Sequence, residues 1–253
     1  MYHGTVSGIT LFVALSAGAR ALPAADNELS PEEKKAGWIL LFDGKSLDGW
    51  MNSNETAPKR PVEEASLDPH RAGHYMVVRK EKFSDFVLAL DFKIAKGTNS
   101  GVFIRTSSLV ALPGKDVGYN GIEIAIDDTP GADFHDTGAL YDLVKPSRNA
   151  MKQENGKREG LWNHMVVTCD GPKLSVELNG EVVTRMNLDE WKLENKRPDG
   201  SDHKFDTAWK DHPRSGYIGL QDHGGEVWFK NLKLLPRKSG DDKALDKKTA
   251  TKG

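Results

Sequence analysis

The fold of this 253-residue chain is decided by one stretch, Phe86-Val87-Leu88-Ala89-Leu90-Asp91-Phe92-Lys93-Ile94. Its large apolar side chains recur at every second position. A β-strand turns alternate side chains to opposite faces, so this spacing gathers Phe86, Leu88, Leu90, Phe92 and Ile94 on one face. The stretch therefore predicts a strand with that face in a hydrophobic core.

The same period of two recurs along the chain. Leu174, Val176 and Leu178 alternate up to Asn179-Gly180, and a β-rich run resumes at once. Asn-Gly between two such runs is a strong signal for a two-residue hairpin. Other short β-rich runs are separated by Gly, Pro, Asn and Asp, and no long helical period occurs. We predict an all-β fold of two packed antiparallel sheets, a β-sandwich.

Composition excludes several classes of function. The residues are 38% hydrophobic and 28% charged, as in a soluble globular protein with a core. A net charge of −2 gives no basic face for nucleic acid. The single cysteine, Cys169, excludes an internal disulfide and a thiolate zinc site. Fingerprints for phosphate loops, serine-nucleophile elbows and dinucleotides are missing from the sequence.

The two ends differ from the rest of the chain. Residues 9–19 form an apolar run that is followed by small residues, which predicts a signal peptide over residues 1–25 and a secreted or periplasmic protein. A short apolar helix is the alternative, and the run is too short for a membrane span. Residues 26–236 are expected to form one domain. The polar residues 237–253 are predicted to be a disordered tail.

Two long polar stretches, residues 52–73 and 192–214, interrupt the β pattern. Loops longer than about 12–15 residues are uncommon in compact domains unless they are functional or mobile. These stretches are candidate walls of a site, or surface insertions without a role.

Several motifs occur together in a fixed order. The first is Leu41-Phe42-Asp43-Gly44-Lys45-Ser46-Leu47-Asp48-Gly49-Trp50, and the others are Asn99-Ser100-Gly101-Val102-Phe103-Ile104-Arg105, Gly121-Ile122-Glu123-Ile124, Thr137-Gly138-Ala139-Leu140-Tyr141, Trp162-Asn163, Leu178-Asn179-Gly180 and Gly219-Leu220-Gln221-Asp222-His223-Gly224. This series, spanning about residues 38 to 235, resembles the 3-keto-disaccharide hydrolase domain family. One departure is Glu123-Ile124-Ala125, where the family commonly has Glu-Val-Gln, and the lost amide implies a different sugar or a different binding mode.

The resemblance implies a fold similar to concanavalin A-like lectins and glucanases, a jelly roll. It also implies an enzyme that cleaves a glycosidic bond in a 3-keto-disaccharide or 3-keto-glucoside, by removal of the C2 proton, elimination and hydration. The same fold also hosts sugar binders without activity, so a non-catalytic lectin-like module is the alternative. A carbohydrate is the expected partner, and the oligomeric state is open.

Alternation places the candidate side chains on two neighbouring strands. Glu123 and Asp127 project to one face of the first strand. On the second strand Arg105 is expected to face the same way, and Asn99 stands at its start. An acid and a guanidinium on this face can bind sugar hydroxyls. The alternative is that Glu123 and Arg105 form a buried ion pair that closes the sheet.

Two loops carry further candidates. His135 follows a loop after the Glu123 strand, and histidine is a common acid or base in catalysis. Gln221, Asp222 and His223 form a dense polar cluster, or a turn in which Asp222 caps backbone amides. The resemblance suggests Glu123 or His135 as the base, Arg105 and His223 as partners of the enolate and leaving group, and Asn99, Gln221 and Asp222 as orienting groups. Direct hydrolysis would instead pair Glu123 with Asp127 or Asp222.

Aromatic and acidic residues complete the set. Trp209, in the polar stretch 192–214, is the best candidate to stack on a sugar ring. Asp127, Asp128 and Asp133 form either a calcium or other divalent-metal site or an ordinary solvated loop. The sequence calls for no other metal and for no organic cofactor.

Overall fold

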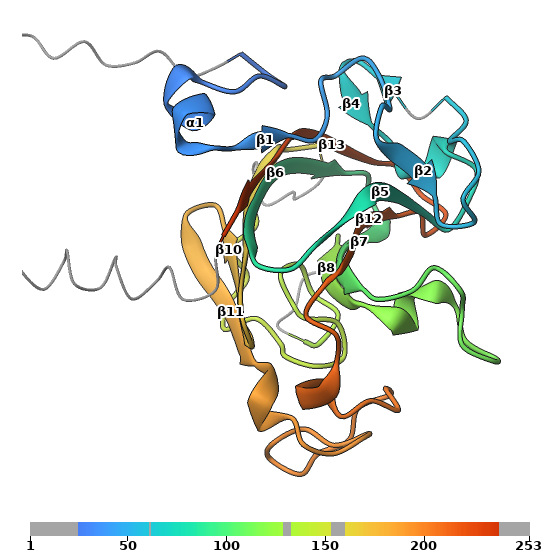
Figure 1. Ribbon diagram of the computed structural model, residues 1–253, viewed down its shortest axis with the longest axis vertical. Coiled ribbons are helices and arrows are strands. Elements are labelled where there is room, and N and C mark those ends of the chain that lie inside the picture. Colours follow the sequence, from blue (N-terminus) through green and yellow to red (C-terminus); the bar gives the residue numbers. More distant parts are fainter. Residues whose placement is uncertain (1–24, 61, 129–132, 153–159, 238–253) are drawn as a thin grey trace, which may run out of the picture.

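The structure, a computed structural model, describes residues 25–60, 62–128, 133–152 and 160–237. Strands dominate this part of the chain, and its helices are short (Figure 1). In chain order the elements are α1 (Pro31–Ala36), β1 (Ile39–Leu40), β2 (Trp50–Asn52), β3 (Val62–Glu63), β4 (Ser66–Leu67), η1 (Pro69–Arg71), β5 (Met76–Phe83), β6 (Phe86–Ile94), β7 (Asn99–Thr106), η2 (Val117–Asn120), β8 (Ile122–Asp127), β9 (Asn163–Asp170), β10 (Lys173–Leu178), β11 (Glu181–Asn187), η3 (Leu188–Glu190), η4 (Trp209–Asp211), β12 (Gly216–Gln221) and β13 (Val227–Pro236).

The strands form two antiparallel sheets, which confirms the predicted β-sandwich. The larger sheet has eight strands in the order β11-β10-β9-β6-β13-β4-β3, with β1 also paired to β13. The smaller has five strands in the order β2-β5-β12-β7-β8. The hairpin between β10 and β11 turns at Asn179-Gly180, where both residues have positive φ angles of 53° and 88°. This backbone is the one that Asn-Gly favours in a two-residue hairpin.

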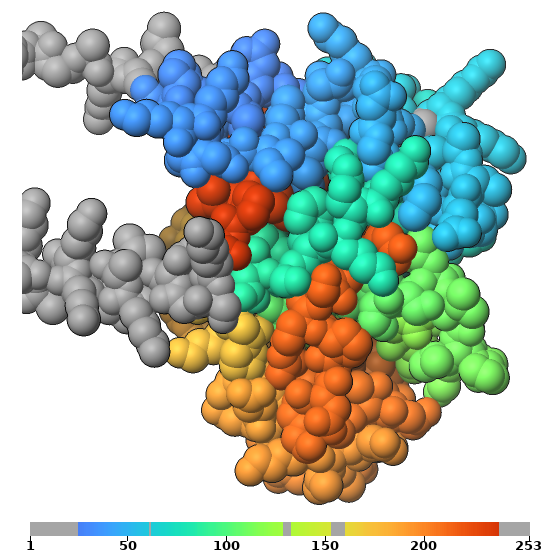
Figure 2. Space-filling model, viewed as in Figure 1, coloured from blue at the N-terminus to red at the C-terminus, as the bar shows by residue number. Residues whose placement is uncertain are grey.

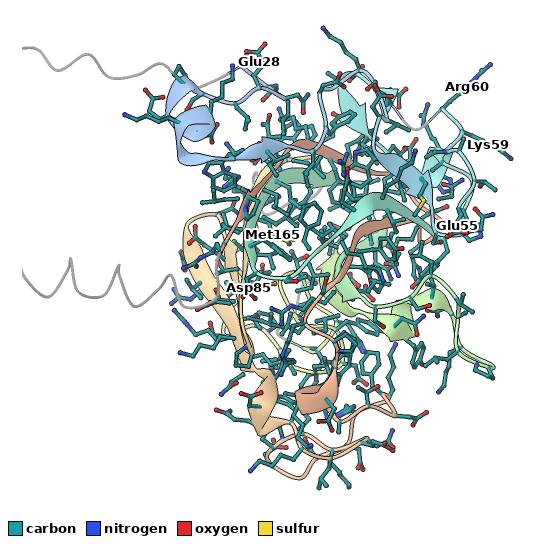
Figure 3. The ribbon with its side chains drawn as sticks, viewed as in Figure 1. Glu28, Glu55, Lys59, Arg60, Asp85 and Met165 are labelled. Carbon is teal, nitrogen blue, oxygen red and sulfur yellow. The ribbon has the colours of Figure 1, made fainter. Side chains whose placement is uncertain are left out.

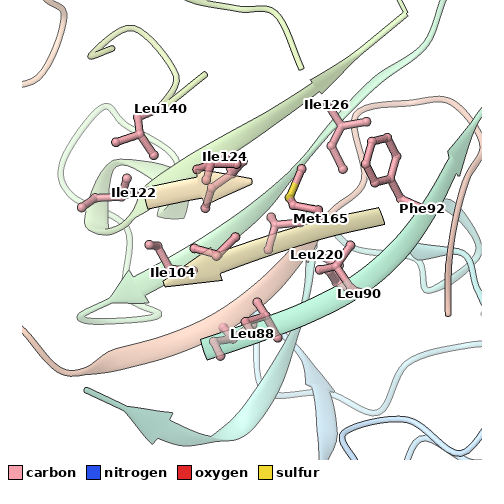
Figure 4. Close-up of a cluster of buried hydrophobic side chains, with 14 of the residues drawn as sticks. Leu88, Leu90, Phe92, Ile104, Ile122, Ile124, Ile126, Leu140, Met165 and Leu220 are labelled. Atoms are coloured by element: carbon pink, nitrogen blue, oxygen red, sulfur yellow. The ribbon is translucent and has the colours of Figure 1, made fainter. Parts of the chain in front are cut away.

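The core lies between the sheets. The five alternating side chains of β6 are fully buried, as predicted. They pack against apolar side chains from the smaller sheet, among them Ile122, Ile124 and Ile126 of β8 and Leu220 of β12 (Figure 4). Burying an aliphatic or aromatic side chain of this size contributes about 1.5–3 kcal/mol, so this interface is the main source of stability.

The outer face of the five-stranded sheet is partly covered by other segments of the chain. A second, smaller apolar cluster of Met76, Val78, Phe103 and Val117 covers part of that face. Tyr75 packs against this cluster and also lines a cavity. No helix in the described ranges is long and apolar enough to cross a membrane.

The predicted signal peptide, residues 1–25, and the predicted disordered tail, residues 237–253, lie outside the described residues except at Ala25 and Arg237. Export therefore stays a prediction from the sequence.

Candidate active site

A cavity of about 220 Å³ opens on the outer face of the five-stranded sheet. Its floor comes from β7, β8 and the end of β12, and its walls come from the segment around η2, the loop after β8 and residues 204–205. The sequence-predicted residues that line it are Asn99, Glu123, Asp127, His135, Gln221 and His223. Segments that are far apart in the sequence thus meet around one opening.

Glu123 lies at the floor because of strand register. It stands opposite Phe103 on β7, and Gly101 stands opposite Ala125 on the same face. The Glu123 side chain crosses Gly101 so closely that a Cβ added there would lie 2.5 Å from Oε1. A side chain at position 101 would therefore displace the carboxyl group, and only glycine leaves it this place. Ala125, where the family commonly has Gln, also lines the cavity.

The environment of Glu123 makes it an unusually strong carboxylate base. Burial raises its pKa to about 8, the positive charge of Lys204 opposes this rise, and the negative charge of Asp116 adds to it. Among the described residues its carboxyl group has no hydrogen-bond or ion-pair partner. A half-buried carboxyl group of raised pKa that lines a cavity and has no protein partner is typical of functional sites rather than of structural ion pairs.

The Tyr75 hydroxyl fixes the amide of Gln221. Gln221 Nε2 donates to this hydroxyl at 3.0 Å. This leaves Gln221 Oε1 buried without a partner in the described chain. Gln221 is thereby presented as an acceptor for a ligand's hydroxyl group.

Residues 192–214 form one wall of the cavity, as the sequence suggested, and contribute Lys204 and Phe205. Figure 2 shows this segment in orange at the bottom of the face in view. The Lys204 Nζ atom lies 4.1 Å from the ring centroid of Tyr141 and 5.0 Å from that of Tyr119. The cavity therefore has one positive group set among aromatic rings, in a lining otherwise rich in acceptors.

The remaining predicted residues lie around the opening. His135 is exposed and stacks on Tyr141 with 4.7 Å between ring centroids. His223 is also exposed, just after β12. Asn99 and Asp127 stand opposite each other across β7 and β8. These groups can donate and accept hydrogen bonds at the rim, where a sugar's hydroxyl groups would enter.

The predicted position of Arg105 is wrong. β7 carries one extra residue relative to β12 at this point, and Arg105 sits in the bulge with φ of 51°. The bulge reverses the alternation, so the guanidinium enters the interior, where it is fully buried. It donates to Oδ1 of Asp85, labelled in Figure 3, at 3.2 Å. Arg105 therefore neither faces a sugar nor pairs with Glu123.

The predicted role of Trp209 is wrong for a similar reason. Its side chain is fully buried in η4 and cannot stack on a ligand. It packs edge-on against Phe205 with 5.2 Å between ring centroids. The polar segment folds over an aromatic cluster of its own, which includes Trp191 and His203. Trp209 thus supports the wall from behind.

Asp222 and residues 52–73 lie beside the cavity, not in its lining. The Asp222 carboxylate accepts from the backbone N–H of Gly224 at 2.9 Å, and Gly224 has φ of 89°. It also pairs with Nδ1 of His70 at 2.9 Å, a contact that raises the pKa of the imidazole. Asp222 is therefore the cap of the turn, which the sequence allowed as the alternative, and it lies outside the lining of the cavity.

The acidic residues proposed for calcium do not form a cluster in the described chain. Asp128 accepts from the N–H of Gly97, and Asp133 accepts from that of Phe134. No group of three His, Cys, Asp or Glu side chains suited to a metal ion occurs among the described residues.

The cavity also contains residues that the sequence analysis missed. Tyr75, Lys204 and the pair Asp116 and Tyr119 come from three segments that are far apart in the chain. The one available signal was the length of the polar segment 192–214, which pointed to a wall but not to the lysine within it.

Comparison with known proteins places the chain in a family. Residues 37–235 match the model of the 3-keto-alpha-glucoside-1,2-lyase-like domain. The chain belongs to this family. A relative from Bacteroides thetaiotaomicron named 3-keto-disaccharide hydrolase is 25% identical over 233 residues, which cover 78% of each chain.

Two crystal structures from Parabacteroides distasonis, both of candidate glycosyl hydrolases, share the family's fold. One is 31% identical, with a TM-score of 0.65 over 79% of this chain and 99% of its own. The other is 26% identical, with a TM-score of 0.67 over 85% of this chain and 100% of its own. These similarities establish the family and the fold of the domain.

Proposed function

We propose that this protein is an enzyme that cleaves the glycosidic bond of sugars already oxidised to a ketone at C3. The observation that carries the proposal is Glu123, a carboxyl group of raised pKa on the floor of a sugar-sized cavity, opposite a lysine. Membership of the 3-keto-alpha-glucoside-1,2-lyase-like family supports the substrate class. The name of the Bacteroides relative supports it as well.

The chemistry follows from the ketone. A carbonyl at C3 acidifies the hydrogen on C2, and a base removes that hydrogen as a proton. The electron pair of the C–H bond moves onto the C3 oxygen as an enolate. When the enolate collapses, the substituent on C1 leaves with its bonding electrons and takes a proton from an acid. Water then adds a hydroxyl group to C1 and a proton to C2, so the net reaction is hydrolysis.

Glu123 is the base in this scheme. A general base is most effective when its pKa lies near the working pH, and burial gives Glu123 a pKa of about 8. His135 and His223 stand at the opening, where they can protonate the leaving group. Gln221 Oε1 lacks a partner within the described chain and accepts from a sugar hydroxyl. Asn99 and Asp127 bind further hydroxyls beside it.

The positions of the carboxylates favour elimination over direct hydrolysis by two acids. Glu123 and Asp127 are four residues apart on one strand, a Cα separation of about 13 Å, since a strand rises about 3.3 Å per residue. Paired carboxyl groups of ordinary glycosidases lie about 5–9.5 Å apart. Asp222 is engaged by His70 beside the cavity. Neither residue is well placed as a second catalytic acid for Glu123.

The test is a panel of 3-keto-glucosides assayed beside their unoxidised parents in deuterated water. We expect cleavage of the keto-sugars alone, and deuterium at C2 of the released keto-sugar. Glu123→Gln keeps the shape but removes the base, so its rate should fall about 10²–10⁴-fold. Glu177→Gln, on β10 of the other sheet, is the matched control and should keep the parent rate.

Other results would redirect the proposal. Full activity in Glu123→Gln with an inactive His135→Ala would make the histidine the base. Cleavage without deuterium at C2 would point to direct hydrolysis. If no member of the panel is cleaved, a carbohydrate-binding module without activity is the better description.

A further inference from the structure

Lys204 is the feature of the cavity that the proposed function leaves unused. Its Nζ atom lies over the rings of Tyr141, Tyr119 and Phe205, at 4.1, 5.0 and 5.2 Å from their centroids. The faces of aromatic rings attract a cation, and three of them hold this ammonium at the wall. Within the described chain no carboxylate forms an ion pair with it. Its hydrogen-bond donors are therefore available to a ligand.

The backbone around Lys204 is anchored to the neighbouring wall, the loop after β8 that carries Tyr141. Its N–H donates to Oδ2 of Asp142 at 2.7 Å. Arg197, from the same segment as the lysine, donates to the carbonyl oxygens of Asp142 and Leu143 at 2.6 and 3.1 Å. The side chains on either side, His203 and Phe205, are buried. The lysine is thus presented from a fixed platform, although it belongs to a long polar segment.

The charges in the cavity show which side of a substrate Lys204 would meet. Glu123 and Lys204 interact electrostatically across the cavity, and the lysine charge opposes the rise in the pKa of Glu123. Gln221 Oε1 is restricted to accepting, and the carboxylates of Asp116 and Asp127 accept as well. A ketone oxygen can only accept, so it has no favourable partner among these three groups. The ammonium of Lys204 is a donor and carries the charge that an enolate needs.

We infer that Lys204 binds the C3 oxygen of the keto-sugar and stabilises the enolate that forms there. This inference rests on the proposed function. The ammonium donates a hydrogen bond to the ketone oxygen in the bound substrate. As Glu123 takes the C2 proton, the electron pair of the C–H bond moves onto that oxygen, and its new negative charge lies against the ammonium. The lysine keeps its proton throughout. The oxidised carbon therefore points to the 204–205 wall, and a neighbouring hydroxyl points to Gln221.

The test compares two substitutions of Lys204 with one control. Lys204→Met retains length and apolar contact with the rings but removes the charge, and kcat on a 3-keto-glucoside should fall about 10²–10³-fold, as when an oxyanion donor is removed. Lys204→Arg keeps the charge and should lose less. Lys210→Met, which removes an exposed lysine of the same segment paired with Asp211, should keep the parent rate.

Two further readouts separate catalysis from a structural role. Without the lysine charge the pKa of Glu123 rises, so the rise of rate with pH should move to higher pH in Lys204→Met. The rate loss should also be similar for aryl and alkyl 3-keto-glucosides, because it arises at the enolate and not at the leaving group. Thermal melting of both Lys204 variants should match the parent, since Lys204 is exposed.

The failure of this inference differs from the failure of the proposed function. A parent protein that cleaves keto-sugars while Lys204→Met keeps the full rate and pH profile would overturn only the role of the lysine. A covalent adduct on Lys204, trapped with borohydride in the presence of a 3-keto-glucoside, would replace the electrostatic role with a Schiff base. A parent protein without any activity on keto-sugars would remove both proposals.

Discussion

The two faces of strand β8 differ in environment, since one lies in the core between the sheets and the other lines the cavity. On the inner face Ile122, Ile124 and Ile126 are almost wholly buried in the core between the sheets. On the outer face Glu123 and Asp127 line the cavity. Neighbours in sequence are thus separated by the thickness of one sheet, which stabilises the protein on one side and supports chemistry on the other. Substitutions on the two faces should accordingly affect different measurements.

The outer face also works against stability. In the unfolded chain a glutamate has a pKa of about 4.3, whereas burial raises that of Glu123 to about 8 in the folded protein. Between these values the folded state retains a proton that the unfolded state has released. The free energy of unfolding therefore falls as pH rises from about 4 to 8. The inner face must offset this cost.

The largest effect expected is on the core side of the comparison. Leu90→Asp places a charge in the fully buried face of β6, beside Met165 on β9. An unpaired buried charge costs several kcal/mol, a large share of the about 5–15 kcal/mol that keeps a domain folded. We expect no cooperatively melting protein. Val87→Asp is the control, because Val87 lies on the opposite, partly exposed face of the same strand, and this variant should fold. Circular dichroism with thermal melting compares the two variants.

If Leu90→Asp were soluble and melted cooperatively, the assignment of the core face of β6 would be wrong. The contrast between a stabilising inner face and a cavity-lining outer face would then also fail.

A smaller effect is expected at Arg105, which was predicted to lie on the outer face and is buried on the inner side. Arg105→Met leaves Asp85 without its partner in a largely buried place, and losing one partner of a buried ion pair costs about 3–5 kcal/mol. Urea unfolding should show this loss, while kcat of the folded protein stays at the parent value. Arg148→Met, which breaks an exposed pair with Glu181, should cost about 1 kcal/mol or less.

A loss of activity in Arg105→Met under conditions where the protein is folded would contradict the structure and would indicate that the arginine acts in the active site.

The mildest test varies pH alone. The base must be ionised to act, so the rate on a 3-keto-glucoside should rise about tenfold between pH 7 and 9, with its midpoint near the pKa of Glu123, about 8. Lys204 and Asp116 are the charged groups that shift this midpoint, in opposite directions. Over the same range Glu123→Gln should gain stability relative to the parent, because the fall with pH is absent.

A rate that falls through pH 8 would instead make Glu123 an acid. Melting temperatures of the parent and of Glu123→Gln that keep the same difference at pH 5 and 9 would show that its pKa is unshifted.

What the sequence predicted well were features set by local pattern. The core face of β6 and the hairpin at Asn179-Gly180 follow from neighbouring residues alone, and alternation placed Glu123 and Asp127 on one face. The Arg105 prediction failed because the bulge depends on how β7 pairs with β12. The periodicity within one strand does not show whether that strand has an extra residue relative to the strand it pairs with.

The walls of the cavity were beyond single-sequence reasoning for another reason. Trp209 stands among polar residues, yet it is buried, because its segment folds upon itself and not because of its immediate neighbours. Tyr75 and Lys204 lie 129 positions apart in the numbering and meet only through the folded chain. The family resemblance pointed to strands and loops that line the cavity, but not to all the side chains that close it.

The bonds of Arg197 to the loop after Tyr141 have a consequence for binding. They join two walls of the cavity when the protein folds, before any ligand is present. Immobilising a flexible side chain at a binding surface costs about 0.5–1.5 kcal/mol in conformational entropy, and ordering a loop costs more. Here the segment that carries Lys204 is already ordered in the folded protein. A sugar that binds therefore loses less binding free energy to the ordering of this wall.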